Sequence, residues 1–308
     1  MGKPPPPKNG PGCVSDPWAG PSLAELDRFT RASQAKWLTA ARRITKLQQS
    51  LYFGLEQSRG ERTKSLLGAL RFAAQREFEF EHWSRILEHR YALDPLSLVG
   101  SLKKGGRFNI GEDLDPSMFT PFPALYVGED YDVAFHECFG NDPGAIQNGL
   151  SATDFALRTP GSFTHVRLRG RLERVLDLDD HEALSTFAKI IGEMEMPREV
   201  NRLVRELGLK RGPRLIRDAK MLRSQLLAKD WRINPMQFDL PANAQIFGRI
   251  AVAAGIQGLL YPSVRAGKGR CLALFVQNWS KSTSFIELED APPPNTHRTR
   301  WDGDVQHR

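Results

Sequence analysis

The strongest constraint on the fold is the texture of the chain from about residue 96 onwards, where short apolar runs are separated by turn residues. Runs of this length, bounded by glycine, proline and aspartate, are typical of the strands of a mixed sheet. The expected strands cover residues 98–101, 107–110, 124–127, 163–168, 174–178, 259–261, 271–276 and 285–288.

Helices are expected between these strands. Asp130 can cap a short helix that contains Val133 and Cys138. A further helix should begin at Pro241 and end at Gly255. The remaining expected helices cover residues 181–191, 197–208 and 214–229. Helices and strands together predict the α+β class.

The first 95 residues have a different pattern. Ser22–Glu25 reads as a capping box that opens a helix, with its glutamate three residues after the serine. A second helix is expected over 61–90, although Phe78–Glu81 alternates as a strand does. Asp94–Pro95 should end this section.

These patterns divide the chain into four parts. The predicted parts are a disordered Pro/Gly-rich tail (1–21), a helical N-terminal extension (22–95), a main domain (96–290) with a basic helical insertion at about 180–235, and a flexible C-terminal tail (291–308).

Composition indicates a soluble globular protein, with 40% hydrophobic and 26% charged residues. No apolar run approaches the roughly 20 residues that a helix needs to cross a bilayer. Met1–Lys3, followed by four prolines, lacks the apolar core of a signal peptide. We therefore expect a cytoplasmic protein with no membrane partner, and the sequence leaves open delivery into other cells by a secretion system.

The cysteines and histidines predict no metal site. Cys13, Cys138 and Cys271 form no close pair, and an odd number argues against a disulfide framework. His82 and His89 lie seven residues apart, which does not match the usual spacing of four in a helical metal pair. Neither a metal nor a prosthetic group is expected.

The net charge of +7 is concentrated in one segment. Residues 201–232 contain ten Lys and Arg side chains against three Asp and Glu. Such a segment can attract nucleic acid, an acidic partner or a charged substrate. No aromatic residue interleaves these charges before Trp231, so direct nucleic-acid binding is not expected. A solvated helix face with a few ion pairs is the simpler interpretation.

Arg107 lies in the sequence Gly-Gly-Arg-Phe-Asn, which begins at Gly105. Its guanidinium fork suits phosphate oxygens, and the glycines let the backbone approach a ligand. Asn109 would lie on the same side of a strand, where it could bind a ribose hydroxyl or hold a turn. The ordinary alternative for Arg107 is an ion pair with Glu112 or Asp113.

Tyr126 and Glu137 follow within the next 30 residues. Tyr126 ends an apolar run, so its ring should be half-buried and its hydroxyl should reach a polar space. It could stack on a ligand ring or be an ordinary core tyrosine. Glu137 lies among apolar neighbours, where a carboxylate is either at an exposed edge or held for chemistry.

Ser263 comes directly after Tyr261-Pro262, where a strand should end. Its hydroxyl could bind a phosphate or Arg107, and Arg265 could add positive charge. No His–Asp relay is visible around Ser263, so it is not interpreted as a nucleophile. The alternative is a turn serine, which the nearby Gly267 and Gly269 favour.

The order of these motifs resembles the RES domain family, which is named for its arginine, glutamate and serine. Gly-Gly-Arg-Phe-Asn, Ala-Leu-Tyr, Ala-x-x-Glu and Tyr-Pro-Ser-x-Arg all look like RES motifs, and the resemblance covers roughly residues 97–140 and 240–280. It implies an ADP-ribosyltransferase-like mixed sheet with flanking helices. The implied catalytic residues are Glu137, Arg107 and Tyr126. The implied NAD-binding residues are Arg107, Asn109, Tyr126, Ser263 and Arg265.

The resemblance also implies a function. Family members look like toxins that degrade NAD by cleaving the nicotinamide–ribose bond, with water or phosphate as the acceptor, and each is neutralised by a cognate antitoxin that often has a helix-turn-helix domain. NAD would be the substrate and not a resident cofactor. Because nicotinamide leaves as a neutral molecule, positive charge develops on the ribose, and a fixed negative group such as Glu137 would stabilise it.

Two other functions remain open at this point. The same pocket could transfer ADP-ribose to a macromolecule bound by the basic insertion. Alternatively, the chain could be a non-enzymatic protein that binds nucleic acid or a partner, although the presence of all four polar groups argues against a decayed pocket. The sequence leaves the oligomeric state open.

Overall fold

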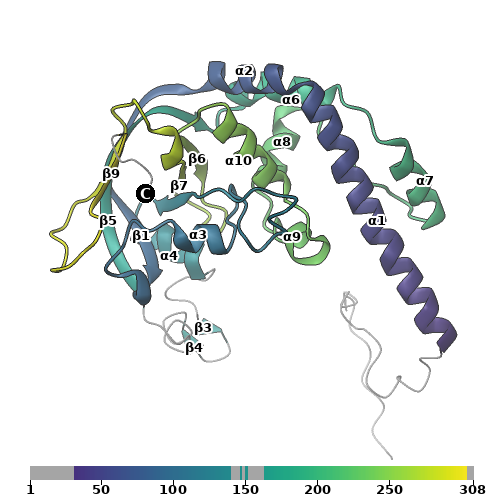
Figure 1. Ribbon diagram of the computed structural model, residues 1–308, viewed down its shortest axis with the longest axis horizontal. Helices are drawn as coiled ribbons and strands as arrows, with labels where there is room; N and C mark the ends of the chain where they lie inside the picture. Colours follow the sequence, from purple (N-terminus) through teal and green to yellow (C-terminus); the bar gives the residue numbers. More distant parts are fainter. Residues whose placement is uncertain (1–30, 140–145, 148–149, 152–162, 304–308) are drawn as a thin grey trace, which may run out of the picture.

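The computed structural model describes residues 31–139, 146–147, 150–151 and 163–303 (Figure 1). The tail predicted over 1–21 and the capping box at Ser22–Glu25 lie outside the described residues.

A mixed sheet of seven strands forms the centre of the molecule, in the order β1-β2-β7-β6-β5-β8-β9. β1 also pairs with β5, so that five of these strands close into a ring. β5 and β6 run parallel, and the other pairs in this sheet are antiparallel. The strands are β1 (Gln75–Glu88), β2 (Leu125–Gly128), β5 (Phe163–Asp177), β6 (Gly258–Pro262), β7 (Arg270–Leu274), β8 (Phe285–Leu288) and β9 (Arg300–Asp302). A separate pair consists of β3 (Ile146–Gln147) and β4 (Leu150–Ser151).

Both faces of the central strands are buried because their side chains alternate between two apolar clusters. In β7, Leu272 and Leu274 pack with Trp83 and Trp279 on one face, whereas Cys271 and Ala273 pack on the other. Near-continuous apolar runs in β6 and β7 are the sequence signature of this burial.

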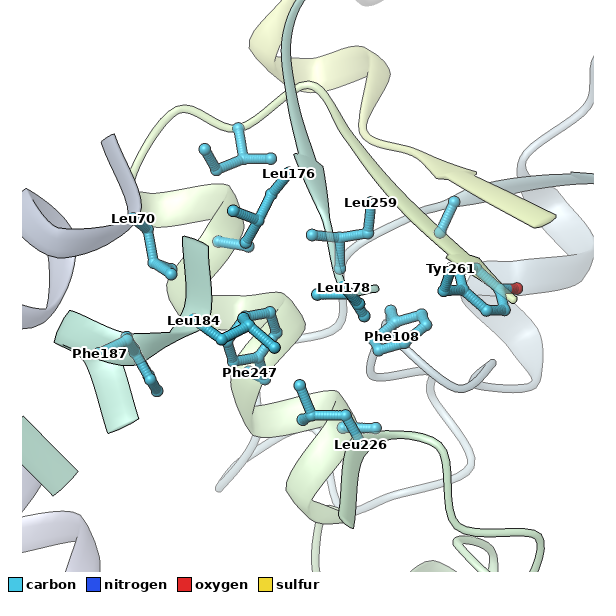
Figure 2. Packing of buried hydrophobic residues seen from close by; sticks show 14 of the residues in the cluster. Leu70, Phe108, Leu176, Leu178, Leu184, Phe187, Leu226, Phe247, Leu259 and Tyr261 are labelled. Carbon is cyan, nitrogen blue, oxygen red and sulfur yellow. The ribbon is translucent and has the colours of Figure 1, made fainter. Parts of the chain in front are cut away.

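Helices cover the second face of the sheet. Leu184 and Phe187 of α6 pack against Phe247 of α10, and the rings of Phe187 and Phe247 meet edge to face at 5.2 Å (Figure 2). The helices are α2 (Thr63–Ala73), α3 (Val99–Lys103), α4 (Tyr131–Phe139), α6 (His181–Gly192), α7 (Arg198–Glu206), α8 (Ala219–Leu226), α9 (Ile233–Phe238) and α10 (Asn243–Ala253). Short 3-10 turns lie at η2 (His89–Tyr91) and η3 (Val276–Asn278).

The longest helix, α1 (Arg31–Glu61), runs along one side of the molecule with α7 beside it (Figure 1). Tyr52 of α1 packs with Phe119 in a small third cluster, which ties α1 to the loop before β2 and to α10. None of the described helices is both long and apolar enough to cross a bilayer.

The α+β class with a mixed sheet is confirmed. Asp130 caps α4 as expected, because its carboxylate accepts a hydrogen bond of 2.8 Å from the Val133 amide. The expected helix that ends at Gly255 is α10, and Gly255 has the positive φ of 77° that favours glycine at a helix end. The strands expected over 163–168 and 174–178 form one continuous strand, β5.

The helix expected over 61–90 is wrong beyond Ala73. α2 ends there, Ala74 is extended, and residues 75–88 form β1. The alternation in Phe78–Glu81 was the correct signal, because Phe80 joins the buried face of the sheet while Glu79 and Glu81 are exposed. The sheet therefore begins inside the stretch predicted as a helical extension, and the domain boundaries stay a prediction.

Three other expectations are corrected. Residues 99–103 form helix α3 instead of a strand, and residues 107–110 form no strand but a tight loop. The tail from Ala291 is not loose throughout, because β9 pairs with β8 and Trp301 is buried in the core. Its indole nitrogen also donates a hydrogen bond of 2.9 Å to the Leu96 carbonyl oxygen.

Candidate active site

A polar cavity of about 250 Å³ opens where β1, β2 and α4 meet the ends of β6 and β7. Its charged and aromatic lining consists of Arg85, Arg107, Tyr126, Glu137, Trp231, Arg232, Tyr261 and Arg265. A more apolar cavity of about 130 Å³ lies between α1, α6, α8 and α10 and contains none of these groups. The chemistry expected from the sequence is therefore gathered in the first cavity.

Glu137 projects from α4, and its carboxylate is held by the segment after β6. The Oε1 atom accepts hydrogen bonds from the Ser263 hydroxyl at 2.7 Å and from the backbone amides of Val264 and Arg265 at 2.9 and 3.1 Å. The Arg265 side chain also donates to the Glu137 backbone carbonyl at 2.7 Å. Within the described chain, Oε2 accepts no hydrogen bond, so one oxygen is fixed and the other is left for a ligand.

Ser263 is buried, and its hydroxyl donates to Glu137 and not to Arg107. Binding of NAD by Ser263 stays a prediction. The hydroxyl also accepts a hydrogen bond of 2.9 Å from the Ala266 amide, which shapes the turn. Ser263 is a positioning residue behind the cavity.

Arg107 is buried and points into the cavity from the loop that follows α3. Its Nη1 atom donates to the carbonyl oxygens of Ala228 and Leu226 at 2.7 and 3.3 Å. Burial lowers the pKa of Arg107, although Tyr261, Glu137 and Tyr126 oppose this. Within the described chain, Arg107 forms no ion pair with Glu112 or Asp113, and its guanidinium instead donates to backbone carbonyl oxygens.

Tyr126 and Asn109 are coupled behind Arg107. The Tyr126 hydroxyl donates to the Asn109 side-chain oxygen and accepts from the Phe108 amide, both at 2.9 Å. Burial strongly raises the pKa of Tyr126, so the hydroxyl stays protonated. Tyr126 is also among the residues that line the cavity.

Asn109 is not among the residues that line the cavity, and its expected contact with a ribose stays a prediction. Its side chain is fully buried, and its amide nitrogen donates to the carbonyl oxygens of Ser101 and Phe122 at 2.8 and 3.0 Å. Its oxygen accepts from the Gly106 amide as well as from Tyr126. Asn109 therefore fixes the loop that presents Arg107.

Glycine is required at two positions of this loop because neighbouring side chains approach the backbone closely. A Cβ on Gly106 would overlap the ring of Tyr126, and one on Gly105 would press on the side chain of Gln245. Gln245 of α10 is buried under the loop and donates to the carbonyl oxygens of Gly106 and Asn109 at 3.2 and 3.0 Å. The loop is thus held from below by buried amides.

Three charged or aromatic lining residues lie outside the motifs named from the sequence. Arg85 lies on β1, in the stretch expected to be helical, and burial lowers its pKa to about 10. Its Nη1 atom is buried without a hydrogen-bond partner in the described chain. The alternation of apolar residues in β1 was the only signal that could have revealed it.

Trp231 and Arg232 are the other two, and both come from the end of the basic segment. The Arg232 guanidinium lies 4.4 Å from the centre of the Trp231 ring, and that of Arg107 lies 5.9 Å from it. Elsewhere in this segment, Arg202 pairs with Glu199 and Glu206, as a solvated helix face would. The basic segment therefore forms ion pairs on a helix surface at its start and contributes to the lining of the cavity at its end.

The cavity carries a strong positive charge. Four arginines line it, at 85, 107, 232 and 265, against the single carboxylate of Glu137. Such a site suits a ligand with more than one negative charge, and the fixed carboxylate suits a centre that becomes positive. Among the described residues, no three His, Cys, Asp or Glu side chains are grouped so that they could hold a metal ion.

The chain matches the RES domain family over residues 82–293, and it belongs to this family. The comparison with curated proteins finds no match. Among solved structures, the chain is similar to one from the M. tuberculosis MbcT-MbcA toxin-antitoxin complex. That similarity has 17% sequence identity and a TM-score of 0.43, and it covers 73% of this chain and 90% of the other.

Proposed function

We propose that this protein degrades NAD by cleaving the bond between nicotinamide and ribose. The observation that carries the proposal is the Glu137 carboxylate, which is fixed through Oε1 by three donors and lines a cavity together with four arginines. A dinucleotide brings both features that this cavity matches, a diphosphate and a ribose carbon that becomes positive.

The chemistry follows from this placement. When the C–N bond breaks, its electron pair leaves with nicotinamide, which departs neutral without needing an acid. Positive charge then develops on the ribose carbon and ring oxygen, and Oε2 of Glu137 stabilises it. Water or phosphate adds to that carbon, and Glu137 orients this acceptor or takes its proton.

The arginines bind the substrate in this scheme. Arg107 keeps one side of its guanidinium on the backbone of residues 226–228 and offers the rest to phosphate oxygens. Arg85 has a buried nitrogen with no partner in the described chain, which a phosphate or ribose oxygen would satisfy. Tyr126 supports the loop and gives the cavity an aromatic edge.

Membership of the RES family supports the biological setting of the proposal. We propose that the protein is the toxin of a toxin–antitoxin pair and acts in the cytoplasm, where NAD is available. Its partner would be an antitoxin with a helix-turn-helix domain that covers the cavity.

The test is the release of free nicotinamide from NAD by the purified protein, with and without phosphate. Formation of ADP-ribose identifies water as the acceptor, and formation of a phosphorylated ADP-ribose identifies phosphate. Transfer of labelled ADP-ribose to a macromolecule would instead favour a transferase. The exposed part of the basic segment supports this alternative, because it could bind a macromolecular acceptor.

Glu137→Gln should lower turnover by roughly 100-fold or more, because a neutral amide cannot stabilise the cationic ribose. Dinucleotide binding and the folded state should persist. The matched control is Glu195→Gln, at an exposed glutamate away from the cavity, which should leave turnover unchanged. Near-normal turnover in Glu137→Gln would contradict the role assigned to this carboxylate.

A further inference from the structure

A further cavity, different from the apolar one between α1, α6, α8 and α10, lies beside the candidate active site, and we call it the second cavity. It has a volume of about 630 Å³ and lies between α1, the loop before β2 and the segment that contains α9. Trp231 and Arg232 line both cavities, so they form the boundary between them. From this arrangement we infer that the second cavity binds the adenosine half of the dinucleotide, an inference that rests on the proposed function.

The size of the first cavity supports this division. Ligand pockets commonly have volumes of roughly 300–1,000 Å³, and the cavity around Glu137 has only about 250 Å³. A dinucleotide consists of two nucleosides joined by a diphosphate. One nucleoside can therefore lie against Glu137, and the other must extend past the Trp231–Arg232 boundary.

Arg232 is placed to bind the link between the two halves. In the described part of the chain, its guanidinium donates no hydrogen bond and has no carboxylate within ion-pair distance, although it is half-buried. Burial lowers the pKa of Arg232, with Asp113 opposing. Other arginines of this protein, such as Arg223 and Arg270, pair with an aspartate. A half-buried cation without an anion is costly, and a diphosphate at the boundary would remove that cost.

The lining of the second cavity suits a purine nucleoside. Trp231, Met236 and Phe238 provide apolar faces for a flat ring, and Met236 is 78% exposed although it is apolar. Gln49 and Gln237 provide amides, which can pair with the hydrogen-bonding edge of adenine. Asp113 and Asp239 provide carboxylates for ribose hydroxyls.

This assignment gives a function to two parts of the chain that carry none of the motifs, which are α1 and the end of the basic segment. Gln49 comes from α1, and residues 231–239 come from the end of the basic segment. Both would recognise the portion of the substrate that does not react.

The experiment compares two substrates, NAD and nicotinamide mononucleotide, which has the same scissile bond but lacks the adenosine half. The variant combines Met236→Ala with Gln237→Ala, two exposed positions whose change should not disturb folding. We expect its KM for NAD to rise roughly tenfold with kcat unchanged, and its KM for the mononucleotide to stay the same. The control is Met118→Ala, at another exposed methionine outside the second cavity.

An unchanged KM for NAD, or equal changes for both substrates, would overturn the inference. If the wild-type protein cleaves neither substrate, the proposed function fails. The adenosine site is then tested separately by equilibrium binding of ADP-ribose. Weaker binding of ADP-ribose by the double variant than by Met118→Ala would support an adenosine site, and equal binding would exclude it.

Discussion

Glu137 uses one carboxylate oxygen for its own positioning, which leaves the other for chemistry. Two of the three donors to Oε1 are backbone amides of residues 264 and 265, and no side-chain substitution removes them. The third is the Ser263 hydroxyl, which lies 126 positions away in the chain. The contribution of Ser263 can therefore be separated from that of the carboxylate itself.

Ser263→Ala should lower kcat about tenfold with little change in KM, because Glu137 keeps two donors but loses the one that fixes its rotamer. It should also cost about 1 kcal/mol of stability, since the half-buried Ala266 amide loses its acceptor. Steady-state kinetics and urea unfolding measure the two effects. Ser185→Ala, at an exposed serine, is the control. A rise in KM with unchanged kcat would point to direct substrate binding by Ser263 instead.

The identities of the polar residues were accessible from sequence, but their partners were not. Arg107, Tyr126, Glu137 and Arg265 line one cavity, as the order of the motifs indicated. Ser263 and Asn109 lie behind it, because a hydroxyl or an amide can satisfy a neighbour as readily as a ligand. Only tertiary contacts decide between these uses.

At the scale of elements, α10 and the loop that presents Arg107 are in direct contact. A Cβ on Gly248 of α10 would overlap the carbonyl oxygen of Phe108, and a backbone atom cannot move aside cheaply. The helix and the loop therefore depend on the absence of a side chain at this position.

Gly248→Ala should destabilise the protein by about 1–3 kcal/mol and reduce turnover, because the loop must shift away from α10. Gly68→Ala is the matched control, since nothing lies within 4 Å of a Cβ at that helical position. The control should be neutral or stabilising, by up to about 1 kcal/mol. Thermal unfolding and nicotinamide release measure both, and equal stability of the two variants would contradict this packing.

A second link between elements is electrostatic. Glu56 of α1 pairs with Arg59 and with Arg249 of α10. Burial raises the pKa of Glu56, but the two arginines outweigh it and leave the pKa below its ordinary value of 4.5. A carboxylate with a lowered pKa stabilises the folded state at pH values above its unfolded pKa, and this contribution is lost as the pH falls through the folded pKa.

The wild-type protein should therefore be more stable than Glu56→Gln at pH 7, and the difference should shrink as the pH falls below about 4.5. Urea unfolding of both proteins between pH 7 and pH 3 measures it. Glu61→Gln, at an exposed glutamate in the same helix, should show a smaller difference. A gap that stays constant over this range would exclude a role for the charge.

The spacing of apolar residues predicted most of the central helices and strands. It failed where the sequence fits both a helix and a strand, or both a strand and a loop. Residues 75–88 follow a helix directly, and the charged residues between Phe78 and Leu87 hid their alternation. Residues 107–110 have the composition of a strand, but the Asn109 side-chain oxygen accepts hydrogen bonds from the Gly106 amide and the Tyr126 hydroxyl, and these contacts hold the segment as a loop. In both cases the tertiary environment decided against the expected structure.

At the scale of the whole molecule, the last strand completes the core. β9 adds only three residues to the sheet, yet Trp301 is 5% exposed and packs in the same cluster as Trp279. The composition of the tail gave no sign of this, because a short strand surrounded by polar residues has no period to detect.

Trp301→Ala should destabilise the fold by about 3–5 kcal/mol, since it removes a large buried ring. Trp37→Ala is the control, because that ring is 69% exposed on α1. Chemical denaturation of the two variants measures the difference. Similar stabilities would show that β9 is dispensable for the core.

The distance in sequence between Glu137 and its donors has a consequence during translation. The ribosome makes the carboxylate at position 137 well before residues 263–265, which hold its Oε1 atom. A nascent chain that ends before Ser263 holds an unanchored acid and no finished pocket. Under the proposed function, protein synthesis would itself delay the onset of toxicity until residues 263–265 have been made and folded, and an antitoxin already present in the cell could bind the new protein at that stage.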